Sequence, residues 1–512
     1  MKLRKPDAVY VDAPGARLET EDREGCLRVT LSSDAAVSLA RLVWELTPEE
    51  VRTEPVRVFS DCWERGYGDL QWSGILPYRQ MPWAFAVSNG SDSDPDVSGR
   101  RTECFGVKVR PGALCAWQYE PRRVTLNLDV RNGGRGVELG KRTLNVCDVV
   151  FGEYRDESAF SALKRFYRLL CDDPLLPPKP VYGSNNWYYA YGKSDRRQIL
   201  TDARLISRLC EGSENRPFMV IDAGWNRHWG SGPWLGNNPD YGDMKSLASE
   251  IAATGAIPGL WVRYLSDEEG DIRDLPDECR LERNRKYLDP SHPEVIRSVR
   301  STTRRISAEW GYRLIKHDFS CFDVCGYWDF QRPDRLTDDG WGFYDPTRTT
   351  AEIMVDLYRA IYASAAPGTI ILACNVPGFL TAGLAHINRA GDDTSGKDWA
   401  RTRRMGVNTL AFRAMCDGAF YKADYDCVGI IRERIPWELN AKWLALLSGS
   451  GTPLFLSLQP GALSEEQLDI VSQALARGAR QTDTAVPLDW MENCCPERWL
   501  INGQEQSFDW RD

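Results

Sequence analysis

Acidic and basic side chains recur at the ends of short apolar runs in the second half of the chain. The run FMVID ends at Asp222, and the run RLIKHD ends at Asp318, with Lys316 two residues earlier. Two adjacent aspartates, Asp392 and Asp393, follow the run HINRAG. A pair of carboxyl groups can supply one nucleophile or base and one proton donor, which is what cleavage of a glycosidic bond requires. The pattern therefore indicates carboxylate chemistry.

Neighbouring charges favour a division of roles between these aspartates. Lys316 and Asp318 project from the same face of an extended strand, because they lie two residues apart. The lysine is expected to hold Asp318 ionised as the nucleophile, whereas repulsion between Asp392 and Asp393 is expected to keep one of them protonated. A single aspartate at a strand end usually caps a helix or pairs with a base, but six polar strand ends on one rim favour a site.

The elements that position these residues alternate between short apolar runs and helical patterns from Val181 onward. Eight runs predict strands, at 181–187, 218–225, 257–263, 313–319, 369–375, 386–391, 418–424 and 452–458. The clearest amphipathic helix is 293–311, with Pro293 at its first position and Gly311 as its stop. Eight β/α repeats predict an α/β fold, a closed (β/α)8 TIM barrel, with functional side chains at the carboxyl ends of the strands.

Two further β-rich regions are predicted on either side of the barrel. Residues 1–155 contain short alternating runs between turn-rich segments, which predicts an N-terminal β-sandwich. Residues 156–180 combine an amphipathic helix with a proline-rich linker, the barrel is expected to span 181–480, and 481–512 to form a short C-terminal β element. The segment 61–72, rich in aromatic and charged residues, is a candidate to reach over the barrel mouth.

Charge and composition argue against several classes of partner. The net charge is −9 and no basic run would track phosphates, so nucleic acid is not expected as a partner. No apolar stretch predicts a membrane span, and no apolar segment behind the basic N-terminus predicts a signal peptide. Fifteen scattered cysteines and four histidines give no clustered metal ligands, so we expect reduced thiols, a cytoplasmic location and no cofactor or metal.

In their order along the chain, these motifs resemble the α-galactosidase (melibiase) clan of glycoside hydrolases, families 27 and 36, over residues 181–512. Six segments of the chain are similar to successive segments of that clan: VIDAGW, GLWV, IKHDF, CNVP, YDCVG and GTPLFLS. The N-terminal β-domain fits the family 36 arrangement. The resemblance implies an enzyme, a retaining α-glycosidase that removes a terminal sugar by double displacement through two aspartates. It implies an oligosaccharide or glycoside substrate, and it leaves a homo-oligomer open.

The resemblance also assigns roles to individual residues. IKHDF places the nucleophile at Asp318 and a sugar-hydroxyl contact at Lys316. GDDT (391–394) is similar to the family 36 acid/base motif and favours Asp392, whereas the family 27 spacing from Arg389, a ligand for the 2-hydroxyl, leads to Asp393. Tryptophan rings stack on sugars, so tryptophans are expected to wall the pocket. The candidate substrate-binding residues are Asp222, Lys316, Arg389, Trp187, Trp225, Trp261, Cys374, Asn375 and Asp424.

Two departures from the clan bear on the choice of sugar. Ala223 stands where family 27 has a second acid, and Asn375 stands where it has a glutamate. The sequence therefore leaves α-galactosides, α-N-acetylgalactosaminides, β-L-arabinopyranosides and α-glucosides open as substrates. A transglycosylase with the same residues and a catalytically inactive carbohydrate-binding relative are the alternative functions.

Overall fold

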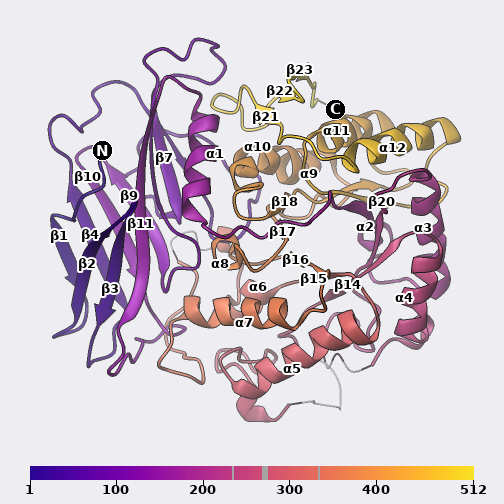
Figure 1. The fold of residues 1–512 in the computed structure, drawn as a ribbon, viewed down its shortest axis with the longest axis horizontal. Coiled ribbons are helices and arrows are strands. Elements are labelled where there is room, and N and C mark those ends of the chain that lie inside the picture. Colours follow the sequence, from indigo (N-terminus) through magenta and orange to yellow (C-terminus); the bar gives the residue numbers. More distant parts are fainter. Residues whose placement is uncertain (233, 235, 268–274, 332–334, 512) are drawn as a thin grey trace.

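The N-terminal part of the chain folds into two antiparallel β-sheets that pack face to face (Figure 1). The computed structural model describes residues 1–511 except 233, 235, 268–274 and 332–334. One sheet has the order β1 (Ala8–Val11), β4 (Leu39–Glu45), β10 (Arg123–Asp129), β9 (Leu114–Glu120) and β6 (Met81–Pro82). The other has the order β2 (Arg17–Arg23), β3 (Cys26–Ser32), β11 (Leu144–Arg155), β8 (Arg101–Val107), β7 (Ala84–Ser88) and β5 (Arg57–Ser60). Alternating apolar residues such as Leu27, Val29 and Leu31 are fully buried in the core between the sheets.

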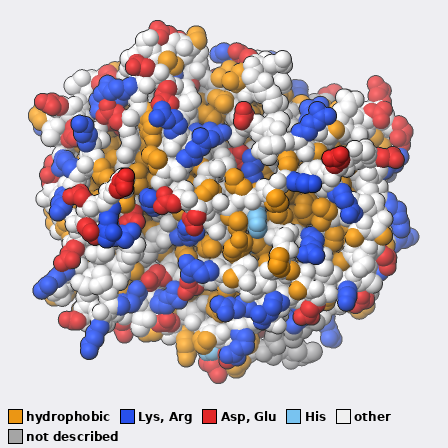
Figure 2. All heavy atoms as spheres, viewed as in Figure 1, with side chains coloured by type: hydrophobic (Ala, Val, Ile, Leu, Met, Phe, Trp, Pro, Cys, Tyr) orange, Lys and Arg blue, Asp and Glu red, His pale blue; other side chains and the backbone are white. Residues whose placement is uncertain are grey.

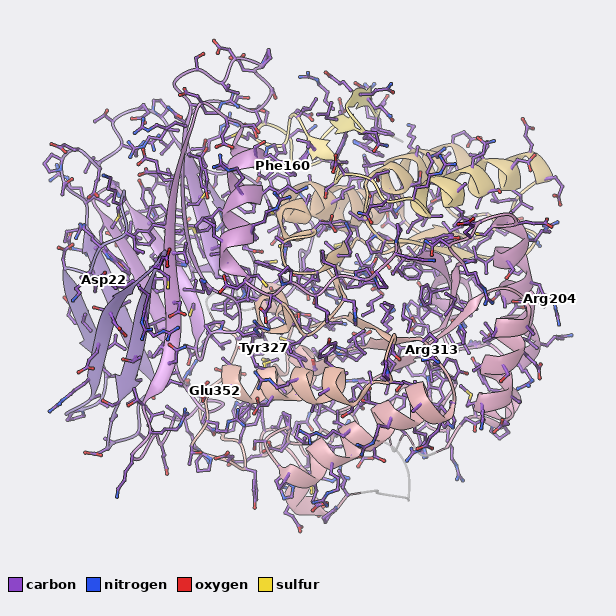
Figure 3. All side chains as sticks on the ribbon, in the orientation of Figure 1. Asp22, Phe160, Arg204, Arg313, Tyr327 and Glu352 are labelled. Atoms are coloured by element: carbon purple, nitrogen blue, oxygen red, sulfur yellow. The ribbon has the colours of Figure 1, made fainter. Side chains whose placement is uncertain are left out.

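Helix α1 (Ala159–Leu170) lies between the six-stranded sheet and the barrel (Figures 1 and 3). Its Phe166 contacts Gly106 of β8 so closely that a Cβ added at Gly106 would lie 3.0 Å from the ring. Phe160, labelled in Figure 3, packs edge-on against Trp490 with 5.7 Å between ring centroids. Helix α1 packs against β8 and β11 of this sheet. The neighbouring strand β7 is buried along its whole length, whereas β3 has one partly exposed face.

The second half of the chain forms a parallel barrel with eight strand positions. The order around the barrel is β12 (Tyr182–Asn185), β13 (Phe218–Ile221), β14 (Ile257–Val262), β15 (Leu314–His317), β16 (Ile370–Ala373), β17 (Ile387–Arg389), β18 (Lys422–Asp424), β19 (Cys427–Ile430) and β20 (Leu454–Leu458). All eight predicted strands are present within their predicted ranges. The predicted fold class, a TIM-like barrel behind a β-sandwich, is confirmed.

The seventh barrel strand is broken in the middle. β18 pairs with β17, and β19, which is separated from β18 by two residues, pairs with β20. At the break, Asp426 has the left-handed φ of 75°. Chain continuity rather than hydrogen bonding therefore joins β18 to β19, and the break turns the Asp426 carboxylate into the barrel, where it is buried.

Helices connect the barrel strands and cover the outside of the barrel (Figure 1). They are α2 (Trp187–Ala190), α3 (Arg196–Leu209), α4 (Met244–Ala253), α5 (Pro293–Arg304), α6 (Ser320–Cys325), α7 (Thr350–Ser364), α8 (Gly378–Thr381), α9 (Trp399–Thr402), α10 (Thr409–Arg413), α11 (Trp437–Gly449) and α12 (Glu465–Gly478). Helix α5 begins at Pro293 as predicted and continues as a π-helical turn, Arg305–Glu309. Gly311, with φ of 85°, follows this turn and ends the helical segment.

The end of the chain returns to the N-terminal sheets. Three short strands, β21 (Val486–Pro487), β22 (Arg498–Ile501) and β23 (Gln504–Ser507), form a small antiparallel sheet. Beside it, Glu492 pairs with Arg57 at 2.8 Å and accepts a hydrogen bond from Ser93 at 2.7 Å. The predicted C-terminal β element is therefore present, and it packs against the sandwich.

Several general properties follow from the described residues. All fifteen cysteines are free thiols, most of them buried. No described helix is long and apolar enough to cross a membrane. Groups of three or more potential metal ligands are absent from the described part of the chain. On the face shown in Figure 2, acidic and basic side chains are interspersed.

Candidate active site

A cavity of about 390 Å³ lies at the carboxyl ends of the barrel strands. Most of the residues predicted from the sequence line it, and they come from six different segments of the barrel. These predicted residues are Trp187, Asp222, Trp261, Lys316, Asp318, Asn375, Asp392 and Asp393. Side chains that converge in this way on one polar cavity are the arrangement expected of a barrel enzyme's active site.

Asp318 follows β15 and is held by three hydrogen-bond donors. The indole Nε1 of Trp261 donates to Oδ2 at 3.0 Å, and the backbone N–H of Phe319 donates to Oδ1 at 2.7 Å. The amide of Asn375 also donates to Oδ1. Phe319 has a left-handed φ of 64° and Asn375 one of 51°, so both donors sit on tight local turns. An ionised carboxylate can accept from all three donors at once, and they fix its orientation in the cavity.

Lys316 makes its direct ion pair with Asp222 rather than with Asp318. Its Nζ binds Oδ2 of Asp222 at 2.7 Å, and the amide of Asn185 donates to the same oxygen at 2.7 Å. Burial by itself lowers the pKa of Lys316, but Asp222 more than compensates, and the pKa is raised. Asp222 follows β13, and Lys316 reaches it from β15 across the end of β14, so the buried ammonium group has a carboxylate partner.

Asp392 is held between two arginines from different parts of the chain. Arg65, from the loop of residues 61–72, binds Oδ1 at 2.8 Å. Arg401, from α9, binds Oδ2 at 2.6 Å. Each oxygen of Asp392 is therefore paired with its own guanidinium group in a charge-assisted contact.

Asp393 has a more open environment than its neighbour. Arg389 binds its Oδ1 at 2.8 Å, and among the described residues no hydrogen bond reaches its Oδ2. The side chain of Asp393 is 38% exposed, against 15% for Asp392. Burial raises the pKa of Asp393, but Arg389 and other nearby cations outweigh burial, and the pKa is lowered. The expected repulsion between the two aspartates is thus overridden by arginines.

Arg389 lies beneath the cavity rather than in its lining. It is buried, and its guanidinium also binds Oδ1 of Asp426 at 2.6 Å. Asp426 in turn accepts from the backbone N–H of Thr394 at 2.7 Å and from the hydroxyl of Tyr188. This buried network connects the break in the seventh strand to the Asp393 side chain, so the predicted sugar ligand Arg389 orients a carboxylate instead.

Three other predicted site residues also lie outside the cavity lining. Trp225 is fully buried, donates to the carbonyl of Trp261 at 2.7 Å and packs against Trp234 and Trp310. Cys374 lies in a buried apolar cluster. Asp424 accepts from the backbone N–H of Asp426 at 3.0 Å. These three side chains do not line the cavity, and their predicted contact with a substrate stays a prediction.

The sequence motifs missed a cationic and aromatic wall on one side of the cavity. Arg65 lies over the rings of Tyr67 and Trp328, at 5.4 and 5.1 Å from their centroids, and Tyr67 contacts Phe330 at 4.6 Å. The loop 61–72 therefore reaches the barrel mouth, as its aromatic and charged composition suggested. Arg401 and Trp229 are further lining residues that no motif indicated.

Over nearly its whole length, the chain shares its fold with α-galactosidases of glycoside hydrolase family 36. No protein-family model and no curated protein sequence matches the chain.

Three solved structures show this shared fold. An α-galactosidase from Thermus thermophilus, in complex with p-nitrophenyl α-D-galactopyranoside, is 17% identical with a TM-score of 0.63, covering 99% of this chain and 98% of that one. A family 36 α-galactosidase from Geobacillus stearothermophilus, in complex with 1-deoxygalactonojirimycin, is 14% identical with a TM-score of 0.65, covering 95% and 71%. An α-galactosidase from Lactobacillus brevis is 13% identical with a TM-score of 0.58, covering 93% and 69%.

Proposed function

We propose that this protein is a retaining, α-galactosidase-like glycosidase that hydrolyses a terminal sugar by double displacement. The observation that carries the proposal is the oriented Asp318 carboxylate, which shares one cavity with a second, exposed carboxyl group at Asp393. Retaining glycosidases use two such groups, one as nucleophile and one as acid and then base. The fold shared with family 36 α-galactosidases supports the same function.

In the first step, an Asp318 oxygen attacks the anomeric carbon while the bond to the leaving oxygen breaks. The leaving oxygen takes a proton from Asp393, and a covalent glycosyl-enzyme results. In the second step, Asp393 removes a proton from water, the water oxygen attacks the anomeric carbon, and Asp318 is released. Two inversions at the same carbon give net retention of configuration.

We assign the acid/base role to Asp393 rather than to Asp392, although the GDDT motif favoured Asp392. A general acid must carry a proton before the reaction, and both Asp392 oxygens are already paired with arginines. Asp393 has one oxygen on Arg389 and a second oxygen that no described residue binds. The pKa of Asp393, which its cationic neighbours lower, has to rise when a sugar covers the carboxyl group and excludes water. Once Asp318 has lost its charge in the glycosyl-enzyme, the pKa of Asp393 falls again, which suits its role as base in the second step.

The remaining polar groups are proposed to hold the sugar ring. Asp222 and Lys316 form a buried ion pair in the cavity and can accept from and donate to adjacent hydroxyls. Trp187 and Trp261 line the cavity and can pack against the C–H face of the ring. Ala223 also lines the cavity and adds a methyl group where an acid would add an acceptor.

A panel of p-nitrophenyl glycosides tests this function directly. The panel contains the α-galactoside, the α-N-acetylgalactosaminide, the β-L-arabinopyranoside and the α-glucoside, each assayed with the wild-type protein and with Asp318→Ala. We expect one of the four to release p-nitrophenol, the activity to be lost in Asp318→Ala, and proton NMR to show the product first in the configuration of the substrate. A product of inverted configuration, or activity that survives in Asp318→Ala, would contradict the mechanism.

A further inference from the structure

The active-site cavity is the inner end of a longer track across the molecule. A second cavity of about 340 Å³ shares Arg65, Tyr67 and Phe330 with the active-site cavity. It shares Trp63 and Gln80 with an open groove of about 710 Å³. The loop 61–72 therefore borders three successive spaces, which lead from the barrel mouth to the outer face of the five-stranded sheet.

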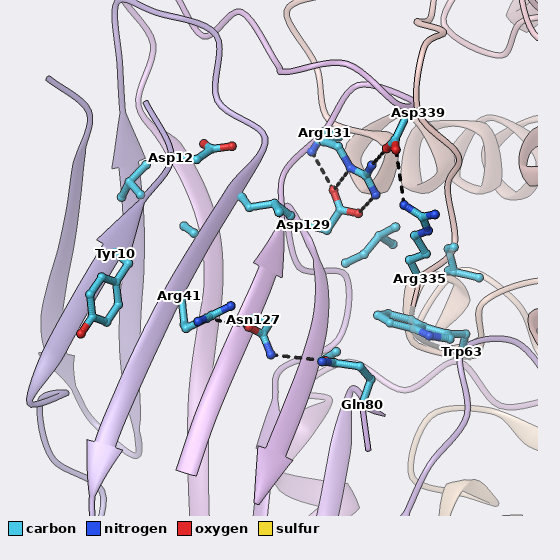
Figure 4. Close-up of a pocket in the computed structure, with 16 residues that line it drawn as sticks. Tyr10, Asp12, Arg41, Trp63, Gln80, Asn127, Asp129, Arg131, Arg335 and Asp339 are labelled. Atoms are coloured by element: carbon cyan, nitrogen blue, oxygen red, sulfur yellow. Dashed lines mark hydrogen bonds and ion pairs between the residues drawn. The ribbon is translucent and has the colours of Figure 1, made fainter. Parts of the chain in front are cut away.

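The groove at the outer end presents a row of planar polar groups above a small-residue floor (Figure 4). Leu114 and Ala116 of β9 form part of the floor. Above them, Arg41 donates to the side-chain oxygen of Asn127 at 2.9 Å, and the amide of Asn127 donates to Gln80 at 3.3 Å. Planar groups of this kind can donate to and accept from adjacent hydroxyls of a sugar.

Exposed aromatic rings occur in each of the three spaces. Phe330, at the border of the first two, is 51% exposed, Tyr78 in the second is 77% exposed, and Tyr10 at the far end of the groove is 58% exposed. A single exposed aromatic residue on a protein surface is ordinary. Three exposed aromatic residues along one track that begins at a glycosidase-like cavity are the arrangement expected of successive sugar-binding positions. Flat apolar faces interleaved with hydrogen-bonding groups match the two kinds of surface that a sugar ring presents.

Charges along the track favour a neutral ligand over an anionic one. Arg131 binds Asp129 at 2.6 Å and Asp339 at 2.7 Å, and Arg335 lies 3.5 Å from Asp339. These arginines are therefore neutralised by carboxylates within the groove. A phosphate or sulfate group would have to compete with two aspartates, whereas hydroxyl groups add to the existing hydrogen bonds.

We propose that this track binds the leaving-group side of a neutral polysaccharide or long oligosaccharide, so that the enzyme trims terminal sugars from a chain held across the sandwich. The inference rests on the proposed function and names its substrate class. The terminal sugar would occupy the barrel cavity, and the chain it is attached to would pass Phe330 and Tyr78 towards Arg41 and Tyr10.

Binding is tested without turnover by affinity electrophoresis of the Asp318→Ala protein in gels that contain galactomannan, arabinogalactan or dextran. We expect at least one polysaccharide to retard the protein, and Tyr78→Ala and Asn127→Ala, each added to Asp318→Ala, to weaken the retardation about tenfold. Tyr362→Ala is the matched control, because Tyr362 is a 38% exposed tyrosine on α7 outside the track. Absence of retardation in all three gels, or equal retardation of every variant, would overturn the proposal.

Kinetics separate this inference from the proposed function. With otherwise wild-type protein, Tyr78→Ala and Asn127→Ala should leave kcat/KM on the active p-nitrophenyl glycoside unchanged and lower it about tenfold on the retained polysaccharide. If no aryl glycoside is hydrolysed but a polysaccharide retards the protein, the proposed glycosidase function is rejected and the binding track is kept. Equal kcat/KM values for each variant on the polysaccharide would reject the track and keep the glycosidase. A dimer that Tyr10→Ala dissociates in analytical ultracentrifugation would assign the groove to a second copy of the chain.

Discussion

At the scale of single residues, the orientation of Asp318 depends on donors that are not themselves acids or bases. Trp261 and Asn375 each hold one carboxylate oxygen, and the Phe319 backbone holds the shape of the turn. In the proposed mechanism, a nucleophile held from three directions is aligned before substrate arrives, which removes part of the orientational cost of the reaction.

Asn375→Ala should therefore lower kcat/KM while leaving the fold intact. Loss of one hydrogen bond to a charged group costs about 1.5–3 kcal/mol, which corresponds to roughly ten- to a hundredfold in rate. The measurement is kcat/KM on the active aryl glycoside, with Val376→Ala as the neighbouring control, because Val376 is buried in the apolar core and does not line the cavity. Similar losses in both variants would mean that packing, and not the Asn375 amide, is responsible.

The assignment of Asp393 makes a prediction about leaving groups. Asp393→Asn should lower kcat/KM strongly for glycosides with a poor leaving group and only weakly for a dinitrophenyl glycoside, because an acidic phenol departs without a proton. Asp392→Asn should affect both substrates alike, since it breaks the Arg65 and Arg401 pairs rather than removing the acid. The reverse pattern between the two variants would return the acid role to Asp392.

Much of the site could be predicted from residue types, and the failures share one physical reason. Asp318, Asp222 and the adjacent aspartates stand at strand ends, where barrel geometry brings them together. The partner that each charge selects depends on distances across the barrel, so the Lys316–Asp222 pair could not be read from spacing along one strand. The Arg65–Asp392 pair joins two regions of the chain that no local pattern connects.

At the scale of elements, β15 carries a buried titratable group between two catalytic-site residues. His317 is almost fully buried, and its ring lies near those of Tyr264 and Tyr358. Burial lowers the pKa of His317 from 6.5 to about 4, with Asp318 opposing the shift. A neutral imidazole therefore forms part of the folded strand.

The stability of the protein should fall between about pH 6.5 and pH 4 for this reason. Below its ordinary pKa, His317 takes up a proton in the unfolded chain but not in the folded one, so the unfolding free energy decreases as the pH falls. The full effect is about 3 kcal/mol, and above pH 6.5 it vanishes. Urea denaturation at pH 7.5 and pH 4.5 should show a smaller loss for His317→Gln than for the wild-type chain. Equal losses in the two proteins would contradict the assignment.

Strand positions were predictable because buried parallel strands are continuous apolar runs, and β13, FMVI, is a clear case. The break between β18 and β19 was not predictable, because the predicted strand ended at Asp424 and YDCVG gave no sign that Cys427–Ile430 would continue the same strand position. The left-handed Asp426 at the break is stabilised by Arg389 and Thr394, and both lie elsewhere in the barrel.

At the scale of the whole molecule, a buried polar cluster joins the sandwich to the barrel. Asp61, just after β5, lies 3.3 Å from the guanidinium of Arg413 on α10 and accepts from the hydroxyl of Tyr167 on α1 at 2.8 Å. Asp61 and Arg413 are each about 1% exposed. A buried ion pair whose partner is removed leaves an uncompensated charge, so this contact is sensitive to truncation.

Asp61→Ala should lower the unfolding free energy by about 3–5 kcal/mol, because Arg413 would remain buried without its anion. Glu45→Ala is the matched control: Glu45 pairs with Arg123 at 2.9 Å on the surface, where such pairs contribute about 0–1 kcal/mol. Chemical denaturation of the three proteins measures the difference. Losses of similar size in the two variants would show that the Asp61 cluster does not hold the molecule together.

The Arg65–Asp392 contact also sets an order of events during synthesis. Residues of the loop 61–72 meet partners that are translated much later; the amide of Asn408, for example, donates at 2.8 Å to the carbonyl of Leu70, 338 positions earlier. At roughly 5–20 residues per second, tens of seconds separate the two ends of such a contact. A ribosome-bound chain whose sandwich has folded therefore exposes the loop 61–72 before the barrel residues that this loop contacts have been synthesised. The proposed glycosidase activity should therefore appear late and abruptly, once the last barrel strand has left the ribosome and the barrel has closed.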